Sequence, residues 1–214
     1  MRVLGIETSS RRGSVALLDD GRVLASAEHS DLNAHAERLL PLLEEVFAQA
    51  KLTRHDVHRV AVGIGPGSFT GLRVGIALGQ GLGLGLGIPV VGVGSLAALA
   101  AAGNGAVRLA LLDARRGEVF VAGYDAEGKE LLAPQALPRD TAIADARGRL
   151  GADAVLIGDV ARELPGGNDA LGGLPHAEWV ARLGSSASAA PEPHYARDAG
   201  AVLPKLPPSP LEPH

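Results

Sequence analysis

A glycine-rich segment, residues 65–75, constrains the fold of this chain more than any other feature. An apolar run at residues 59–63 precedes it and is typical of a buried strand, and an apolar stretch at residues 71–87 follows it. A strand, a glycine–proline turn and a helix N-terminus in this order leave backbone N–H groups free, and many proteins hold phosphate groups there. The sequence therefore predicts an α/β protein with a turn of the nucleotide-binding kind.

The known phosphate-binding fingerprints nevertheless do not fit this turn. The pattern G-x-x-x-x-G-K-[ST] lacks its lysine, and Ser68 takes the place of the third glycine when G-x-G-x-x-G is counted from Gly63. The nucleophile pattern G-x-S-x-G fails as well. No histidine and acid can be placed beside Ser68 or Thr70, so these hydroxyls are expected to act as caps and turn hydroxyls for the following helix.

The composition places the chain among ordinary globular proteins. Its 214 residues allow one large domain or two small ones, and 46% of them are hydrophobic and 21% charged. A net charge of −4 gives no overall basic field for nucleic acid, although it leaves room for a local basic patch. The absence of cysteine excludes disulfides, thiolate metal sites and cysteine nucleophiles, and it suits a cytoplasmic protein.

Membrane insertion is not expected. The first residues form too short an apolar run for a secretory signal. Residues 74–94 carry no charge and are about as long as a membrane span, but Ile88 and Pro89 divide them into a helix and a strand. A buried core is the preferred interpretation.

The elements predicted before Gly103 follow the order β-β-β-α-β-α-β-α. Three antiparallel strands continued by parallel crossovers predict a mixed five-stranded sheet with helices packed on it. Asn33 and Ser95 are expected to cap the first and third helices. The expected strands are residues 3–6, 14–18, 23–29, 59–63 and 89–93, and the expected helices are residues 33–50, 71–87 and 95–102.

Gly103, Asn104 and Gly105 mark a predicted boundary between two lobes. The smaller lobe is expected to hold strands at residues 107–112, 118–124 and 154–157 and a helix at residues 142–150. The predicted divisions are an N-terminal lobe at residues 1–104, a smaller C-terminal lobe at residues 105–200 and a proline-rich tail at residues 201–214.

The histidines do not predict a metal site. His35 opens a predicted helix, and the residue four positions on, where a second histidine could share a metal, is Leu39. His55 and His58 lie in a charged segment with no third ligand nearby. We therefore expect no metal and no other cofactor.

For two predicted helical surfaces, the sequence does not determine what packs against them. Gly71, Gly75 and Gly79 share one helical face, and each interior glycine costs about 1 kcal/mol relative to alanine. This face must approach something closely, either the sheet of the same chain or a partner helix. The apolar stripe on the preceding helix is broader than one sheet face requires, which favours a partner.

Five motifs resemble those of the TsaB (YeaZ) family, which acts in the biosynthesis of threonylcarbamoyladenosine in tRNA. The motif at residues 65–73 is nearly diagnostic, and the resemblance covers residues 1–201. The five motifs are GIETS at residues 5–9, HAERLLP at residues 35–41, GPGSFTGLR at residues 65–73, DARRGEV at residues 113–119 and YARDA at residues 195–199.

The resemblance implies an actin-like ATPase (ASKHA, ribonuclease H-like) fold of two lobes whose own active site is degenerate. It implies a non-catalytic partner of TsaD, the catalytic subunit. Together with the ATPase TsaE, TsaD transfers threonylcarbamoyl from threonylcarbamoyl-adenylate to N6 of adenosine-37 in tRNAs that read ANN codons. The tRNA would be reached only through this complex. TsaD carries a second, metal-binding histidine where Leu39 stands here, which agrees with the absence of a predicted metal site.

The first hairpin binds phosphates in this superfamily. The resemblance therefore implies that Glu7, Thr8 and Ser9 form a degenerate phosphate-binding hairpin, and many relatives have aspartate in place of Glu7. From the residues alone, a polar tight turn with Glu7 at a sheet edge is the alternative. The alternative function is an independent ATPase or glycopeptidase-like hydrolase that depends on Glu7.

The resemblance further implies pairing with TsaD through the N-terminal helices. A homodimer in isolation that buries the same helices is a further hypothesis. A bulky residue at Gly75 or Gly79 is then expected to abolish pairing without unfolding the chain. The implied interface residues are Leu39, Leu42, Leu43, Val46, Leu72, Gly75, Ile76, Gly79 and Gln80.

Overall fold

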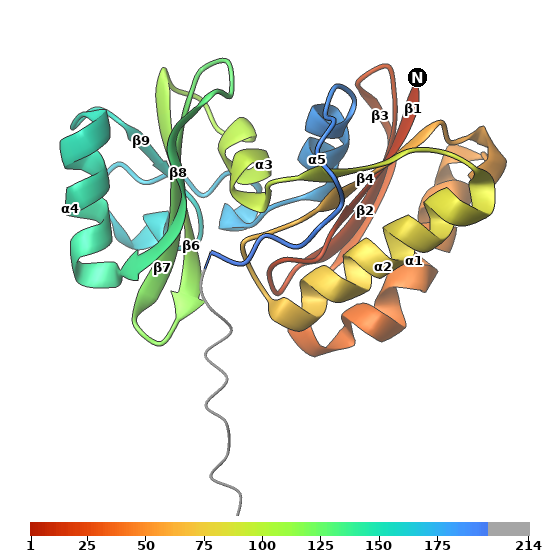
Figure 1. Ribbon diagram of the computed structural model, residues 1–214, viewed down its shortest axis with the longest axis horizontal. Coiled ribbons are helices and arrows are strands. Elements are labelled where there is room, and N and C mark those ends of the chain that lie inside the picture. Colours follow the sequence, from red (N-terminus) through yellow and green to blue (C-terminus); the bar gives the residue numbers. More distant parts are fainter. Residues whose placement is uncertain (197–214) are drawn as a thin grey trace, which may run out of the picture.

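The computed structural model describes residues 1–196, and two β-sheets form its framework (Figure 1). Sheet A has five strands in the order β3-β2-β1-β4-β5, and sheet B has four in the order β8-β7-β6-β9. The strands of sheet A are β1 (Arg2–Glu7), β2 (Gly13–Asp19), β3 (Arg22–His29), β4 (Arg59–Gly63) and β5 (Val90–Val93). Those of sheet B are β6 (Val107–Arg115), β7 (Glu118–Asp125), β8 (Glu130–Pro138) and β9 (Val155–Ile157).

Sheet A is mixed, as the sequence predicts. Strands β1, β2 and β3 are antiparallel neighbours, while β4 lies parallel to β1 and β5 lies parallel to β4. Helical crossovers precede β4 and β5, because a short turn cannot join two parallel strands. Together with sheet B, this topology confirms the predicted two-lobed actin-like ATPase fold.

Helices cover both faces of each sheet. In sheet A, Leu4 of β1 packs toward α1 and α2, whereas Val3 packs toward α5, because successive strand residues point to opposite faces. In sheet B the same alternation separates a core under α3 from a core under α4. The helices of the described chain are α1 (His35–Ala50), α2 (Phe69–Leu86), α3 (Ser95–Ala101), α4 (Arg139–Leu150) and α5 (Ala177–Gly184).

The two lobes exchange one helix each. Helix α3 follows the last strand of sheet A, yet Leu96 and Leu99 pack into the core of sheet B. Helix α5 follows sheet B, yet Val180 and Ala181 pack into the core of sheet A. The division into residues 1–104 and 105–200 stays a prediction, and the tail at residues 201–214 lies outside the described residues.

Two elements were not predicted from the sequence. Strand β8 contains Pro134 and Pro138, and it lies at the edge of sheet B, where a missing N–H donor is tolerated. Helix α5 is only two turns long, but its buried residues Ala177, Val180, Ala181 and Gly184 have helical spacing and could have predicted it.

The predicted helix caps are correct for one helix of three. Ser68 caps α2 by accepting a hydrogen bond from the Gly71 N–H group at 3.2 Å. The Asn33 prediction is wrong, because Asp31 accepts the Asn33 N–H bond in a short 3-10 turn ahead of α1. Ser95 does not cap α3 either, since its hydroxyl turns toward Glu7 instead.

Within residues 1–196, no helix combines the length and the hydrophobicity that a membrane span requires.

Candidate functional site

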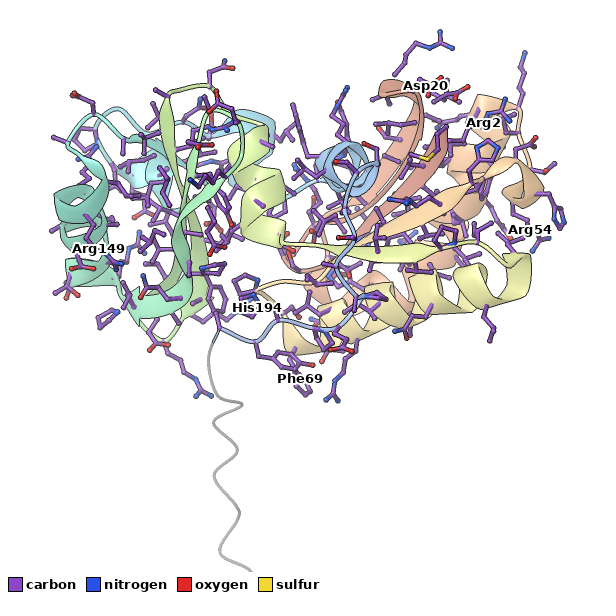
Figure 2. The ribbon with its side chains drawn as sticks, turned by 45° about the horizontal axis from the view of Figure 1, so that its top comes forward. Arg2, Asp20, Arg54, Phe69, Arg149 and His194 are labelled. Carbon is purple, nitrogen blue, oxygen red and sulfur yellow. The ribbon has the colours of Figure 1, made fainter. Side chains whose placement is uncertain are left out.

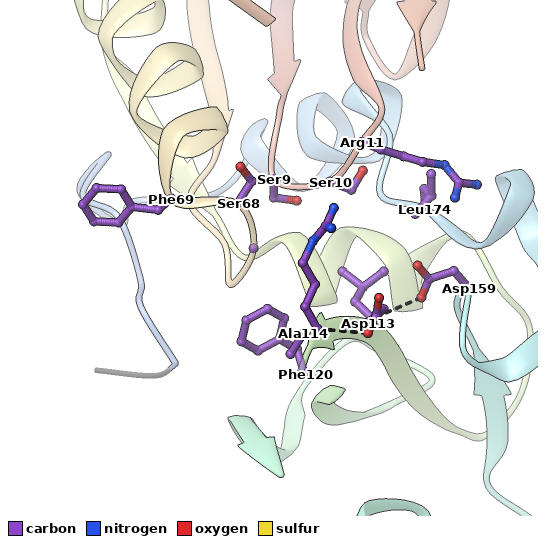
Figure 3. A pocket seen from close by; sticks show the side chains of 13 residues that line it. Ser9, Ser10, Arg11, Ser68, Phe69, Asp113, Ala114, Phe120, Asp159 and Leu174 are labelled. Atoms are coloured by element: carbon purple, nitrogen blue, oxygen red, sulfur yellow. Dashed lines mark hydrogen bonds between the residues drawn. The ribbon is translucent and has the colours of Figure 1, made fainter. Parts of the chain in front are cut away.

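A cavity of about 380 Å³ opens between the two sheets (Figure 3). The β1–β2 hairpin and the turn before α2 line it from the side of sheet A, and the β6–β7 hairpin lines it from the side of sheet B. Its polar and charged lining residues are Ser9, Ser10, Arg11, Ser68, Asp113, Arg115 and Asp159.

Glu7, at the end of β1, is fully buried and does not line this cavity. Its Oε1 accepts the Ser9 N–H bond at 2.6 Å, and its Oε2 accepts the Ser95 hydroxyl at 2.9 Å. Ser95 Oγ in turn accepts the Gly65 N–H bond at 3.1 Å. Burial raises the pKa of Glu7, although the hydrogen bonds from Ser9 and Ser95 oppose this rise. The carboxyl group therefore joins the first hairpin to the loops before α2 and α3.

Thr8 and Ser9 fasten the first hairpin to the start of α2. Thr8 Oγ1 donates to the Gly71 carbonyl oxygen at 2.8 Å, and the Ser9 carbonyl oxygen accepts the Ser68 N–H bond at 2.6 Å. Ser9 is 3% exposed, and its Oγ has no hydrogen-bond partner within the described residues. The three residues implied for a degenerate phosphate hairpin thus lie together, but their role in phosphate binding stays a prediction.

The glycine face of α2 packs on the sheet of the same chain. A Cβ atom at Gly71 would lie 2.1 Å from the Thr8 carbonyl oxygen, and one at Gly75 would lie 2.3 Å from Thr8 Oγ1. At Gly79 it would lie 2.3 Å from Cγ1 of Val62. Close approach therefore occurs within the chain, which is one of the two alternatives that the sequence left open.

The apolar residues that the sequence assigns to the interface are buried in the folded chain. Their side chains are at most 8% exposed and form one core cluster with sheet A, and their place in an interface stays a prediction. The stripe is broad because α1 packs on β2, β3 and α2 together. The buried residues are Leu39, Leu42, Leu43, Val46, Leu72 and Ile76. Gln80 is exposed, and its amide donates to the Pro191 carbonyl oxygen at 3.3 Å.

Other residues of the same two helices do face outward. Leu40 of α1 is 56% exposed and Leu84 of α2 is 88% exposed. A Cβ atom at Gly81 or Gly85 would meet nothing within 4 Å. This outer surface was not predicted, because the larger apolar stripe on α1 dominates the sequence pattern. We call Leu40, Gly81, Leu84 and Gly85 the outer helix face.

A pair of histidines supports the first hairpin from behind. His35, which is 3% exposed, places Nε2 at 2.9 Å from the Ser10 carbonyl oxygen and Nδ1 at 3.2 Å from Nε2 of His29. The Asp31 N–H group donates to Nδ1 of His29 at 3.2 Å. One neutral tautomer of each ring satisfies all three contacts, with N–H on both Nε2 atoms. Burial lowers the pKa of both histidines. The role of His29 was not predicted, because β3 and α1 meet only in the fold.

This pair predicts an acid-sensitive fold. The folded chain keeps both rings neutral while the unfolded chain takes up protons near the ordinary histidine pKa. The free energy of unfolding should therefore fall as the pH drops below that value. Urea unfolding between pH 8 and pH 5 measures this slope. His29→Gln should make the slope shallower, whereas His55→Gln, at an exposed histidine, should leave it unchanged. Part of the slope should remain in His29→Gln, because burial also lowers the pKa of His176. An equal slope in His29→Gln would contradict the assignment.

Two carboxylates form the sheet B side of the cavity (Figure 3). Asp159 Oδ1 accepts the Asp113 N–H bond at 3.1 Å, and Asp113 Oδ1 accepts the Arg115 N–H bond at 2.9 Å. Burial raises the pKa of Asp159. Asp113 and Arg115 belong to the DARRGEV motif, whereas Asp159 was not predicted because it comes from a different part of the chain.

Within residues 1–196, no group of three or more histidine and acidic side chains could hold a metal ion. Leu39, at the position of the missing second histidine, is 2% exposed in the core beneath α1.

Comparisons with known proteins point to the biosynthesis of threonylcarbamoyladenosine in tRNA. Residues 22–150 match the family model described as "TsaD: tRNA N6-adenosine threonylcarbamoyltransferase". The tRNA threonylcarbamoyladenosine biosynthesis protein TsaB of Escherichia coli is 42% identical over 128 residues, which cover 58% of this chain and 55% of that protein. TsaB of Bacillus subtilis is 33% identical over 126 residues, with coverage of 58% and 55%. The chain thus spans about half the length of the curated relatives it matches.

Solved structures match over nearly their whole length. A crystal structure from Pseudomonas aeruginosa, described as an uncharacterized protein with similarity to peptidase YEAZ, superposes with a TM-score of 0.75 at 31% identity. This match covers 92% of this chain and 99% of that one. The structure of YeaZ from Pseudomonas aeruginosa gives a TM-score of 0.72 at 30% identity, with coverage of 91% and 99%.

Proposed function

This chain belongs to the TsaB (YeaZ) family, and from that premise we propose that it is a non-catalytic subunit of the assembly that makes threonylcarbamoyladenosine in tRNA. Its partners are the transferase TsaD and the ATPase TsaE. In the cytoplasm, the assembly transfers threonylcarbamoyl from threonylcarbamoyl-adenylate to N6 of adenosine-37 in tRNAs that read ANN codons. This chain positions and activates TsaD and carries out no step of the transfer.

The engagement of Glu7 is the observation that carries this proposal. A general acid, a general base or a metal ligand must present its carboxylate to a substrate or an ion. Both oxygens of Glu7 are instead bound by groups of the same chain, and the side chain is fully buried. The acid that begins the superfamily's phosphate hairpin therefore works here as a structural link, which supports a scaffold over an independent ATPase or hydrolase.

The outer helix face is the surface that we propose for pairing with TsaD. Leu84 projects almost entirely into solvent, and Gly81 and Gly85 beside it let another backbone approach closely. Leu40 adds an apolar contact from α1. A second copy of the chain uses the same surface in isolation, because one patch can serve both a symmetric and a related partner.

Reconstitution with TsaD and TsaE tests the function. Modification of an unmodified tRNA should require this chain, and an equal yield without it would contradict the proposal. Leu84→Glu should abolish co-purification with TsaD and reduce the modification, because it buries an unpaired charge in the interface. Leu131→Glu, an equal change at a 43% exposed leucine of β8, is the matched control and should have no effect. Pairing that survives Leu84→Glu would place the interface elsewhere.

A further inference from the structure

The β6–β7 hairpin holds two arginines in a backbone conformation that arginine rarely adopts. Arg115 and Arg116 have φ angles of 61° and 55°, and Gly117 follows with 78°. Two-residue hairpin loops with positive φ favour asparagine and glycine. A left-handed residue with a side chain costs roughly 1 kcal/mol. The chain thus keeps charged residues where smaller ones would fold better, and such strain is characteristic of functional positions.

Neither of these guanidinium groups is used within the described chain. Arg115 and Arg116 are exposed, and their side chains form no ion pair or hydrogen bond in residues 1–196. Arg115 lines the cavity from sheet B, and Arg11 lines it from the β1–β2 hairpin. Figure 3 shows Arg11 and Ser10 on one side of the opening and Asp113 and Phe120 on the other. Positive charge therefore lies on both sides of the cavity mouth.

An exposed aromatic pair forms a third part of this mouth. Phe69, which also lines the cavity, is 44% exposed, and Tyr195 is 40% exposed. Their ring centroids are 5.2 Å apart, and the Arg73 guanidinium lies 3.8 Å from the Phe69 ring centroid. Arg73 Nε donates to Tyr195 Oη at 3.4 Å, so the two rings are held in place before any ligand arrives.

The sheet B side of the cavity also carries negative charge. Asp113 and Asp159 would repel a phosphate group placed against them, so an anion is favoured only beside the arginines. The same carboxylates could accept hydrogen bonds from the exocyclic amino group of a base. Arginines for phosphates, aromatic rings for stacking and acceptors for base edges are the groups that proteins use to bind unpaired nucleotides.

We propose that the mouth of this cavity binds single-stranded RNA directly. Arg11, Arg115 and Arg116 contact its phosphates, and an unpaired base stacks on Phe69 and Tyr195. The proposal rests on the proposed function, from which the RNA is an unpaired segment of the tRNA, and it goes beyond the expectation that tRNA is reached only through the complex.

The sharpest test removes the charge and the strain together. In the full-length chain, Arg115→Asn combined with Arg116→Asn should weaken binding of an unmodified tRNA, measured by fluorescence anisotropy. The slope of log affinity against log salt should become shallower by about 1 for each phosphate that the variant no longer binds. The melting temperature should rise at the same time, because asparagine suits positive φ better. If the arginines had only a structural role, the variant would not lose tRNA affinity while its melting temperature rises.

Matched controls come from exposed arginines far from the mouth. Figure 2 shows Arg54 and Arg149 at opposite ends of the molecule, both away from Phe69. Arg54→Gln combined with Arg149→Gln removes the same charge and should leave affinity and salt slope unchanged. Phe69→Ala should weaken binding at least roughly fivefold with little change in slope, because it removes stacking rather than charge.

Three results would overturn the proposal. The first is an unchanged affinity and salt slope in the double asparagine variant. The second is an equal decrease in tRNA affinity in the control pair. The third is a double asparagine variant that loses TsaD binding but still binds tRNA. The last would assign the arginines to a protein partner. These are equilibrium binding measurements without a modification step. A chain that binds tRNA here but is dispensable in reconstitution would therefore refute the proposed function alone.

Discussion

Gly71→Ala should destabilise the chain by about 3 kcal/mol, although alanine normally stabilises a helix interior. The new Cβ would lie 2.1 Å from the Thr8 carbonyl oxygen and 3.2 Å from the His35 ring. A backbone oxygen cannot rotate out of the way. Helix α2 must therefore lift from the first hairpin, which also strains the hydrogen bond from Thr8 Oγ1 to the Gly71 carbonyl. Urea unfolding followed by circular dichroism measures the decrease in stability.

The same helix provides the matched control. Gly81→Ala introduces the same methyl group where nothing lies within 4 Å, so helix propensity alone should act and stabilise the chain by about 1 kcal/mol. Opposite signs at Gly71 and Gly81 would show that α2 has one face on the sheet and one face open. A stabilising Gly71→Ala would mean that the helix does not rest on the hairpin.

This contrast changes how the interface can be probed. From the sequence, a bulky residue at Gly75 or Gly79 is expected to abolish pairing without unfolding the chain. Gly75 touches Thr8 of the first hairpin and Gly79 touches Val62 of β4, so a bulky residue at either should unfold the chain. A loss of pairing would then say nothing about a partner. Substitutions on the outer helix face separate pairing from folding.

Much of the fold was predictable because its strongest signals are local. The apolar runs of β1, β2, β4 and β5 and the turn before α2 are continuous in sequence, and they predict the mixed sheet with its crossovers. The exchange of α3 and α5 between the lobes was not predictable, since both helices are short. Which sheet each helix packs on depends on the path of the connecting chain, and the spacing of apolar residues does not indicate that path.

The site was harder to predict because its residues meet across long stretches of chain. Ser95 reaches Glu7 over 88 positions, and Asp159 reaches Asp113 over 46. Each is an ordinary polar residue in its local sequence. The apolar stripe of α1 is visible in the sequence, but the pattern does not show that the stripe packs on β2, β3 and α2 in the fold. Sequence pattern shows that a surface is apolar, and only the fold shows what covers it.

Substitution of Glu7 should separate a structural acid from a catalytic one. Glu7→Ala removes the acceptor of the Ser95 hydroxyl and of the Ser9 N–H group in a buried setting, which should cost about 3 kcal/mol of stability. Glu7→Gln keeps the shape and an acceptor oxygen, so the folded chain should survive. Reconstituted tRNA modification should then stay close to the wild-type level with Glu7→Gln, because the proposed scaffold needs neither a proton nor an ion ligand from this side chain.

The pH dependence of Glu7→Gln gives an independent check. Burial raises the pKa of Glu7, so the folded chain keeps the proton at pH values where the unfolded chain has lost it. Its contribution to the free energy of unfolding is therefore complete below the ordinary glutamate pKa and declines as the pH rises toward the folded pKa. Glu7→Gln should remove this decline, which urea unfolding above pH 4.5 would reveal. A variant that loses this decline and retains modification marks Glu7 as a structural link. If Glu7→Gln stays folded but abolishes modification, Glu7 takes part in the chemistry and the proposal of a non-catalytic scaffold is refuted.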